Sequence, residues 1–375
     1  MAVANPETRP NTRLYDNHTR NDYRLPDNGR LNAYVDNVVR TGMKGIIRPG
    51  ELTDLAERVD ANKAMRALPV GLSEEDFLNT LRLSLLTECA TDTYAQVFVS
   101  SAQRYDQPWL GRFTEKVWTP DEQMHHLPFK TMLMQLGFSE ESLNKDIKDA
   151  EETDYIHEVG TTPIHLTTFG MDQEYMTDNW YGLQWKIFRP TSPEAAHMVA
   201  RIKQRETLHT IWDRDMSALQ IEENPELIAH VAEASLRFRM PGNQIVPELQ
   251  SRAIEWMLFM GVDFMRMNKD LIKLTAQITQ SPERTGRLVM EIAEQQGLRL
   301  GPITINHINA AMNRLGGPGY GLIGEALMVS AGVKESFTDH EQGIVERIRG
   351  SVRNWLAGEI DKRLASKAIP IPVKT

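Results

Sequence analysis

The chain has 375 residues, of which 41% are hydrophobic and 25% are charged, as in ordinary globular proteins. Its 51 acidic side chains outnumber the 42 basic ones, and no basic stripe follows any segment, so we expect no nucleic-acid partner. The single cysteine, Cys89, excludes an intramolecular disulfide framework and any cysteine-rich zinc or iron–sulfur site.

Two further properties bear on localisation. No apolar run reaches about 18 residues, so we predict no membrane-spanning helix and no membrane partner. The first 32 residues are polar and lack the apolar core of a signal peptide. Because a lone thiol needs no oxidising compartment, we expect a cytoplasmic protein.

The N-terminal part predicts an arm followed by short helices. Residues 1–30 contain several prolines and asparagines and little apolar periodicity, which predicts a flexible arm. Short helices are predicted over residues 31–43 and 51–67. Ser73 is a good N-cap for a long helix that extends to about residue 103.

Long helices are predicted through the middle of the chain. One covers residues 108–136, where Pro120 and Pro128 should kink or interrupt it. Another begins at Pro193, behind the serine cap Ser192, because proline suits the first helical position. The remaining helices in this part are predicted over residues 140–156, 167–188 and 224–238, and the helix that begins at Pro193 should reach about residue 220.

The last third continues the helical pattern. Residues 244–274 predict two helical runs, and further helices are predicted over residues 283–296, near 322, and over 339–366. We find no internal repeat and no alternating strand set, so we predict an all-α fold. The expected organisation is an arm (1–30), a bundle (31–242), additional helices packed on the bundle (243–367) and a C-terminal tail (368–375).

One motif points to metal chemistry. Glu122 and His125 are three residues apart in a segment that predicts helix, so both side chains would lie on one face and could bind one ion. The spacing recurs at Glu206/His209 and at Glu194/His197, whereas chance predicts about one such pair. Glu194 lies just inside a helix start, where an acid complements the helix dipole, so we interpret that third pair as structural.

Two more acids lie in apolar segments, Glu88 and Glu174. A buried carboxylate needs a counter-ion or a metal, although four surface or capping acids would give the same pattern. Four carboxylates would neutralise two divalent ions. The candidate metal ligands are therefore Glu88, Glu122, His125, Glu174, Glu206 and His209. His126 projects about 100° away from His125, so we expect it beside the ligands or at the surface and not as a ligand. We expect structural roles for five histidines without a Glu partner at ligand spacing: His157, His165, His230, His307 and His340.

The motif Trp118-Thr119-x-Asp121-Glu122-x-x-His125 resembles the W-T-x-E-E-x-x-H motif of the soluble acyl-[acyl-carrier-protein] desaturases of plants and actinobacteria. Other segments resemble that family in the same order: Glu88-Cys89-Ala90-x-x-Thr93-Tyr94, Gln173-Glu174-x-x-Thr177, Glu206-x-x-His209 and Met240-Pro241. The resemblance covers residues 70–242.

The resemblance implies a ferritin-like di-iron four-helix bundle with additional N- and C-terminal helices. It implies two Fe ions (Fe2+), with O2 as oxidant, and a catalytic role for Thr177 in oxygen activation. The expected activity is O2-dependent desaturation of an acyl chain carried on acyl carrier protein, with electrons from a ferredoxin-type donor, in a homodimer. Arg112, Lys116 and Lys130 are candidates for contacting the acidic carrier, and Tyr94, Met124, Phe169 and Met176 for lining an apolar channel.

One departure keeps alternatives open. The family has an acid directly before its second Glu-x-x-His pair, and that acid orients a ligand histidine. Arg205 stands at this position and cannot accept the same hydrogen bond, so the surroundings of the ligands must differ. A di-iron monooxygenase, hydroxylating or N-oxygenating a carrier-tethered or small substrate, is the first alternative. A non-catalytic ferritin-like iron-binding protein is the second.

Overall fold

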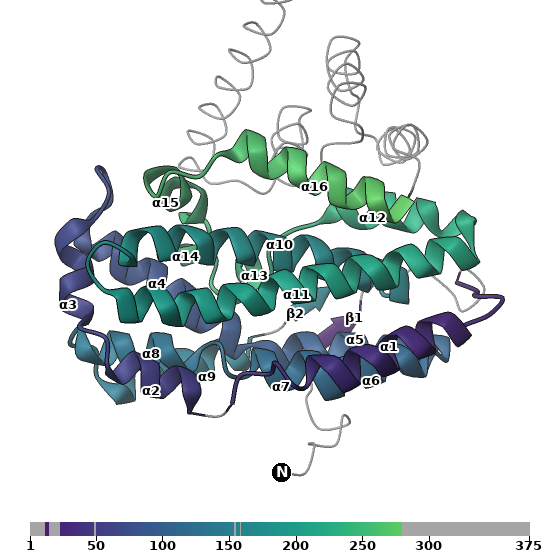
Figure 1. The fold of residues 1–375 in the computed structure, drawn as a ribbon, viewed down its shortest axis with the longest axis horizontal. Coiled ribbons are helices and arrows are strands. Elements are labelled where there is room, and N and C mark those ends of the chain that lie inside the picture. The colour runs from purple at the N-terminus through teal and green to yellow at the C-terminus, as the bar shows by residue number, and fades with distance from the viewer. Residues whose placement is uncertain (1–11, 15–22, 49, 154, 158, 280–375) are drawn as a thin grey trace, which may run out of the picture.

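The computed structural model describes residues 12–14, 23–48, 50–153, 155–157 and 159–279. Within these residues the protein is mostly helical (Figure 1). The helices expected over residues 283–296, near 322 and over 339–366, together with the tail 368–375, lie outside the described residues.

Four long helices form the centre of the molecule: α4 (Glu74–Cys89), α5 (Thr91–Tyr105), α10 (Pro163–Phe188) and α11 (Pro193–Glu223). The predicted N-cap of α4 is confirmed, since the Ser73 side chain accepts a hydrogen bond from the backbone of Asp76. The single helix expected over residues 73–103 is two helices, because Ala90 leaves the helical backbone conformation between α4 and α5. Buried hydrogen bonds from Trp180 and Gln184 to the Ser84 hydroxyl join α10 to α4.

The segment with Pro120 and Pro128 is interrupted, as predicted. It consists of α6 (Pro108–Phe113), a π-helical turn (Thr114–Trp118), α7 (Thr119–Glu122) and α8 (Leu127–Gln135). Pro120 has no N–H, so it cannot complete the regular helical bonding, and wider turns accommodate it. His125 lies in the turn between α7 and α8 and not inside a helix, which corrects the expectation from the sequence.

Shorter elements surround this centre. They are α1 (Gly29–Gly42), α2 (Glu51–Glu57), α3 (Ala61–Ala64) with a 3-10 turn (Met65–Ala67), and α9 (Glu140–Glu151). The helix expected over residues 140–156 ends at Glu151, because residues 155–157 form a strand. This strand, β2 (Tyr155–His157), pairs in parallel with β1 (Thr12–Leu14), whose residues lie in the predicted arm. A partner distant in sequence thus overrides the local helical pattern.

After α11 the chain continues through a 3-10 turn (Pro225–Leu227), α12 (Ile228–Arg237), α13 (Gly242–Ile245), α14 (Pro247–Gln250), α15 (Ala253–Phe259) and α16 (Phe264–Thr279). Helix α12 packs on α10, and α16 packs against both α11 and α10 (Figure 1). None of the helices in the described part of the chain combines the length and the apolar character needed to cross a bilayer.

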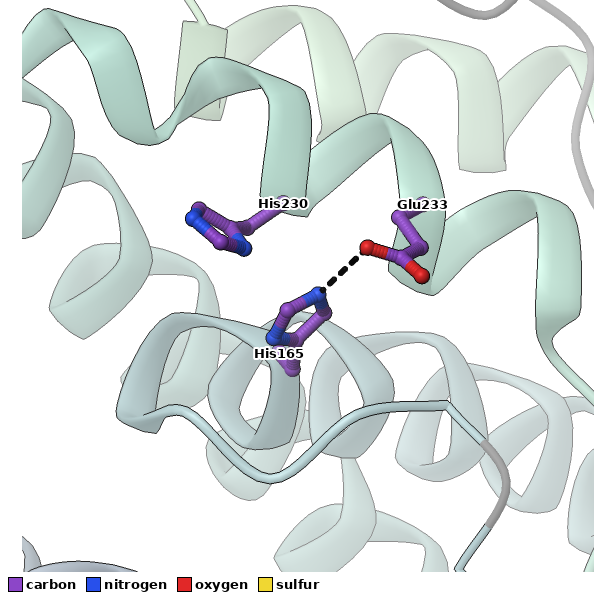
Figure 2. Close-up of side chains that lie close together, drawn as sticks. All are labelled: His165, His230 and Glu233. Atoms are coloured by element: carbon purple, nitrogen blue, oxygen red, sulfur yellow. Dashed lines mark hydrogen bonds and ion pairs between the residues drawn. The ribbon is translucent and has the colours of Figure 1, made fainter. Parts of the chain in front are cut away.

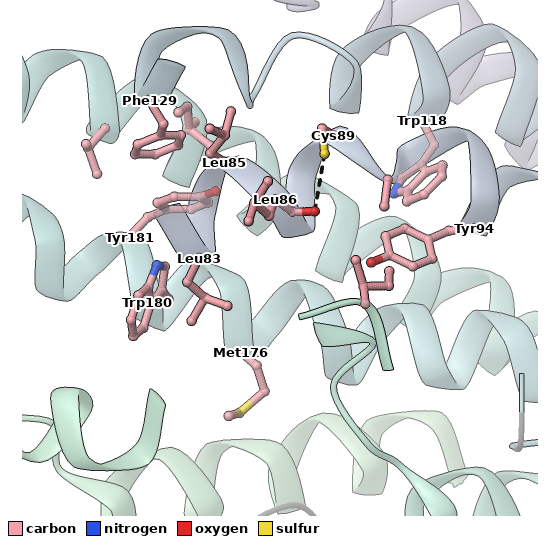
Figure 3. Packing of buried hydrophobic residues seen from close by; sticks show 14 of the residues in the cluster. Leu83, Leu85, Leu86, Cys89, Tyr94, Trp118, Phe129, Met176, Trp180 and Tyr181 are labelled. Atoms are coloured by element: carbon pink, nitrogen blue, oxygen red, sulfur yellow. Dashed lines mark hydrogen bonds between the residues drawn. The ribbon is translucent and has the colours of Figure 1, made fainter. Parts of the chain in front are cut away.

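The main hydrophobic core extends over most of the described helices, and part of it lies between α4, α8 and α10. The Phe129 and Tyr181 rings stack with centroids 5.7 Å apart, next to Leu85 and Leu86 (Figure 3). The Cys89 thiol is buried on the same helix and donates to the Leu86 carbonyl at 3.3 Å. These apolar contacts exclude water from a region that also contains buried acids.

Candidate metal centre

Six buried ionisable side chains converge between the long helices. Glu88 lies near the C-terminal end of α4, and Glu174 lies in the middle of α10. The other four form the two pairs predicted from spacing: Glu122 with His125, and Glu206 with His209 on α11. Glu88, the most exposed of the six, is 8% exposed. The structure therefore brings together all six candidate ligands named from the sequence.

The six residues form two overlapping groups, each able to hold one ion. Glu88 and His125 belong to one group, Glu174 and His209 belong to the other, and Glu122 and Glu206 belong to both. Within each group the ligand atoms all lie within 4.8 Å of one another. His125 Nδ1 is 3.0 Å from a Glu206 oxygen, and His209 Nδ1 is 2.6 Å from a Glu122 oxygen. Two ions held here would share two carboxylates and have one histidine each.

The polar atoms at the centre of this cluster fit metal binding. Within the described part of the chain, Nδ1 of both histidines and both carboxylate oxygens of Glu206 are buried and form no hydrogen bond of regular geometry, although a carboxylate oxygen lies within 3.0 Å of each Nδ1. Buried polar atoms normally form hydrogen bonds. Bound cations would compensate the buried nitrogen and oxygen atoms that lack them here. Four carboxylates also match the charge of two divalent ions. The donor set of imidazoles and carboxylates suits iron and does not exclude manganese or zinc.

The electrostatics of the cluster show its need for positive charge. Burial, with added repulsion from Glu122, raises the pKa of Glu206 and of Glu174, and burial raises the pKa of Glu88 to about 7. Burial opposes the charged form of His209, but the charges and hydrogen bonds of Glu122, Asp121 and Glu174 together outweigh it and raise that pKa to about 10. The metal-free cluster therefore retains protons, which binding of divalent ions would displace.

Glu88 and Glu174 each belong to a single ligand group, and an aromatic side chain holds each of them. The Trp118 indole N–H donates to Glu174 at 2.9 Å, and the Tyr181 hydroxyl donates to Glu88. Each donor fixes one carboxylate oxygen and leaves the other facing the centre. Such outer hydrogen bonds orient metal ligands.

The two histidines have different surroundings. Asp121 accepts a hydrogen bond from His209 Nε2 at 3.1 Å, which turns Nδ1 of that ring toward the carboxylates. The same carboxylate binds the Nε–H of Arg205, a side chain that is only 2% exposed. In the described structure, by contrast, His125 Nε2 is buried without a hydrogen-bond partner. The hydrogen-bond surroundings of the two histidines therefore differ.

A small pocket of about 30 Å3 adjoins the centre. Its lining includes Glu88, Glu122, Glu174, Thr177 and Tyr94, together with residues 240–242. This volume exceeds the roughly 10–15 Å3 that one water needs, so the pocket has room for O2 or a few waters. Of the four channel candidates, Tyr94 lines this pocket, whereas Met124, Phe169 and Met176 do not. The Thr177 hydroxyl donates to the Gln173 carbonyl at 3.0 Å.

The remaining sequence candidates lie away from the centre. Glu194 and His197 are both exposed on α11, as expected for a structural pair. Arg112 forms an ion pair with Asp36 at 3.2 Å, and the candidate carrier contact Lys130 forms one with an acid of α9 at 3.1 Å.

Two features escaped the sequence analysis. Tyr181 follows Glu174 by seven residues on α10. This spacing places both side chains on one helix face, so the sequence does indicate that Tyr181 lies near the candidate ligands. The expectation that His230 lacks a Glu partner at ligand spacing is wrong, whereas His165 has no such partner along the chain. Glu233 follows His230 by three residues in α12, in the reverse order of the motif, and both lie beside His165. His307 and His340 lie outside the described residues.

Neither a model of a known protein family nor a curated protein matches this chain. The resemblance to the acyl-carrier desaturases therefore rests on the motif residues alone.

Proposed function

We propose that this protein is a ferritin-like di-iron oxidoreductase that uses O2. The observation that carries the proposal is the pair of overlapping ligand groups that share Glu122 and Glu206. In ferritin-like di-iron bundles, two helices each contribute one Glu and two others each contribute a Glu-x-x-His pair. Here α4 and α10 supply the single acids, and α7 with its following turn and α11 supply the pairs.

The protein residues have separate tasks in this proposal. Two iron ions bound at the centre would supply O2 activation and oxidation of an unactivated C–H bond. Trp118 and Tyr181 hold the terminal carboxylates in position, and Asp121 orients the His209 ring. The surrounding apolar core excludes water, which protects a reactive site from side reactions. Thr177 lines the adjoining pocket on the α10 face that carries Glu174, where the resemblance assigns a role in oxygen activation.

The favoured reaction is desaturation of an acyl chain on acyl carrier protein, with a ferredoxin-type electron donor and a homodimeric enzyme. The ordered set of motif residues supports this substrate. The pocket beside the centre is too small for a long chain, so the chain would have to displace the pocket wall formed by residues 240–242. We place the enzyme in the cytoplasm.

A di-iron monooxygenase is the second candidate. The small size of the pocket suits a small substrate better than a long acyl chain. The uneven surroundings of His125 and His209 also distinguish this centre from the pattern of the desaturase motif. Both candidate reactions require the same two ions.

One reaction separates the two candidates. The protein is loaded anaerobically with ferrous iron, the bound iron is counted, and a reductant, O2 and a carrier protein bearing a long saturated acyl chain are added. Mass spectrometry of a product lighter by two hydrogen atoms supports desaturation, and a product heavier by one oxygen atom supports monooxygenation. Less than one iron per chain would contradict both.

A double substitution and a matched control test whether the activity depends on the candidate metal centre. Glu122→Ala with Glu206→Ala removes both shared carboxylates, so we expect loss of bound iron and of all product. Glu194→Ala removes an exposed acid with the same spacing to a histidine and serves as the matched control. It should keep full iron content and activity.

A further inference from the structure

A second cluster of ligand-type side chains lies between α10 and α12 (Figure 2). His165 is in the first turn of α10, and His230 and Glu233 occupy one face of α12 because they are three residues apart. His165 Nε2 is 3.3 Å from a Glu233 oxygen, and the two imidazole rings have centroids 4.7 Å apart. Ligand atoms of the three residues all lie within 4.8 Å of one another.

The His165 ring is held in a defined orientation. Its Nδ1 is 2.6 Å from the Thr162 hydroxyl oxygen, so that nitrogen is occupied by a hydrogen bond. The ring packs directly on the backbone of Gly160, where a Cβ would lie 2.9 Å from three ring atoms, and Gly160 has a φ of +106°. These contacts leave Nε2 facing Glu233. A histidine with one nitrogen hydrogen-bonded and the other facing a carboxylate and a second imidazole has the arrangement of a metal ligand.

The cluster has the chemistry of a zinc site. Two imidazoles and one carboxylate form the protein ligand set of many zinc sites that keep a fourth position for water. Zinc–ligand bonds of about 2.0–2.2 Å place tetrahedral ligands about 3.4 Å apart, close to the distance already found between His165 and Glu233. His165 is buried, whereas the Glu233 side chain is 15% exposed, so solvent reaches the side of the cluster from which an ion would enter.

We propose that His165, His230 and Glu233 bind one divalent transition-metal ion of the zinc type, in addition to the central metal centre. The ion would join the beginning of α10 to α12. Helix α12 leads directly to Phe238, whose ring packs on Phe169 with centroids 5.4 Å apart, and then to residues 240–242, which line the pocket beside the central site. The bound ion would therefore fix the segment that forms this pocket wall.

The test counts zinc on the full-length protein. Wild type, His230→Gln and Glu233→Gln are each dialysed against Zn2+, and bound zinc is measured per chain by elemental analysis. We expect each variant to bind one ion fewer than wild type. His197→Gln, which removes an exposed histidine of α11, is the control and should bind as many ions as wild type. Equal zinc content in wild type and both variants would overturn the proposal, and the cluster would then be an ordinary His–Glu ion pair.

Two further measurements make the result independent of the central site and of folding defects. The variant Glu122→Ala with Glu206→Ala should still lose one zinc ion when His230→Gln is added, because the two sites share no ligand. Anomalous diffraction at the zinc edge from crystals of the wild-type protein should show a peak between His165, His230 and Glu233. Absence of that peak from zinc-soaked crystals would also overturn the proposal.

Discussion

Asp121 lies between the imidazole of His209 and the buried guanidinium of Arg205. It accepts hydrogen bonds from both and from the backbone N–H of Ile47 at 3.2 Å. Burial raises its pKa, but the His209 hydrogen bond and the charges of His209, His125 and Arg205 together outweigh that effect, so the net pKa is lowered and the carboxylate stays charged. Arg205 also lies over the Trp212 ring, 5.3 Å from its centroid. Arg205 and Asp121 thus form a buried ion pair next to His209, a candidate ligand.

We predict that Arg205→Met destabilises the protein by about 3–5 kcal/mol, because it leaves the Asp121 charge buried without the guanidinium that pairs with it. Adding Asp121→Asn should recover part of this loss, since the unpaired charge is then gone. Urea unfolding of the two single variants and the double variant measures the coupling. Strict additivity of the two single effects would show that the ion pair contributes nothing.

Asp172 is a second buried acid, 1% exposed, close to the Ser235 hydroxyl at 3.4 Å. Burial raises its pKa from 3.8 to about 8, and the Ser235 hydrogen bond opposes this only in part. The folded state therefore holds a proton that the unfolded chain releases above pH 3.8. The stabilisation from this group is complete below that pH and is lost as the pH rises toward 8.

We predict that Asp172→Asn removes this pH dependence. From pH 5 to pH 8 the free energy of unfolding of the metal-free wild type should fall by up to about 1.4 kcal/mol per pH unit more than that of the variant. Urea unfolding at both pH values measures the two slopes. Asp54→Asn, at an exposed position on α2, should have the slope of the wild type. Parallel slopes for Asp172→Asn and wild type would refute the assigned protonation.

Among elements, the contact between α10 and α11 positions one half of the centre. Gly170 lies one turn before Glu174, and Asp213 lies one turn after His209. A Cβ at Gly170 would lie 2.5 Å from an Asp213 carboxylate oxygen. The absence of a side chain at residue 170 therefore allows the two helices to approach closely where they carry ligands.

We predict that Gly170→Ala destabilises the protein by about 1–3 kcal/mol, as overpacking in a dense core does. It should also weaken metal binding, because it separates Glu174 from His209. Gly182→Ala is the matched control on the same helix, since its Cβ would lie 3.3 Å from the flexible end of Lys203. Chelator competition and thermal unfolding compare the two variants. Equal effects would mean that the approach at Gly170 does not position the ligands.

For the whole molecule, the central cluster makes folding and metal binding interdependent. Four carboxylates and two histidines are buried together, and several of their atoms have no protein hydrogen-bond partner in the described residues. Ions that bind only the folded state stabilise it according to their concentration and affinity.

We predict that ferrous iron at about 100 times its dissociation constant stabilises the wild type by about 2.7 kcal/mol for each site filled. Glu122→Ala with Glu206→Ala should show no such increase under the same conditions. Anaerobic thermal unfolding with and without iron measures the difference. Equal iron-dependent stabilisation of the two proteins would place the iron outside the proposed centre.

The sequence by itself determined the mostly helical fold and the residues of the central cluster. Helical periodicity, the Ser73 cap and the breaks at Pro120 and Pro128 depend on residues that are close together in the sequence, so they can be predicted from the sequence alone. The repeated Glu-x-x-His spacing corresponds to one helical turn, so it too can be recognised in the sequence. The reversed order of His230 and Glu233 is equally local.

Only the tertiary structure decided which of these residues contact one another. It assigned Glu122 and Glu206 to both ligand groups, paired Trp118 with Glu174 and Tyr181 with Glu88, and placed His165 beside α12. It also formed a strand from residues 155–157, where a helix was expected to end at residue 156, because residues 12–14 lie alongside. These contacts join residues separated by tens to more than a hundred positions. They depend on how whole helices pack, and no local pattern specifies that arrangement.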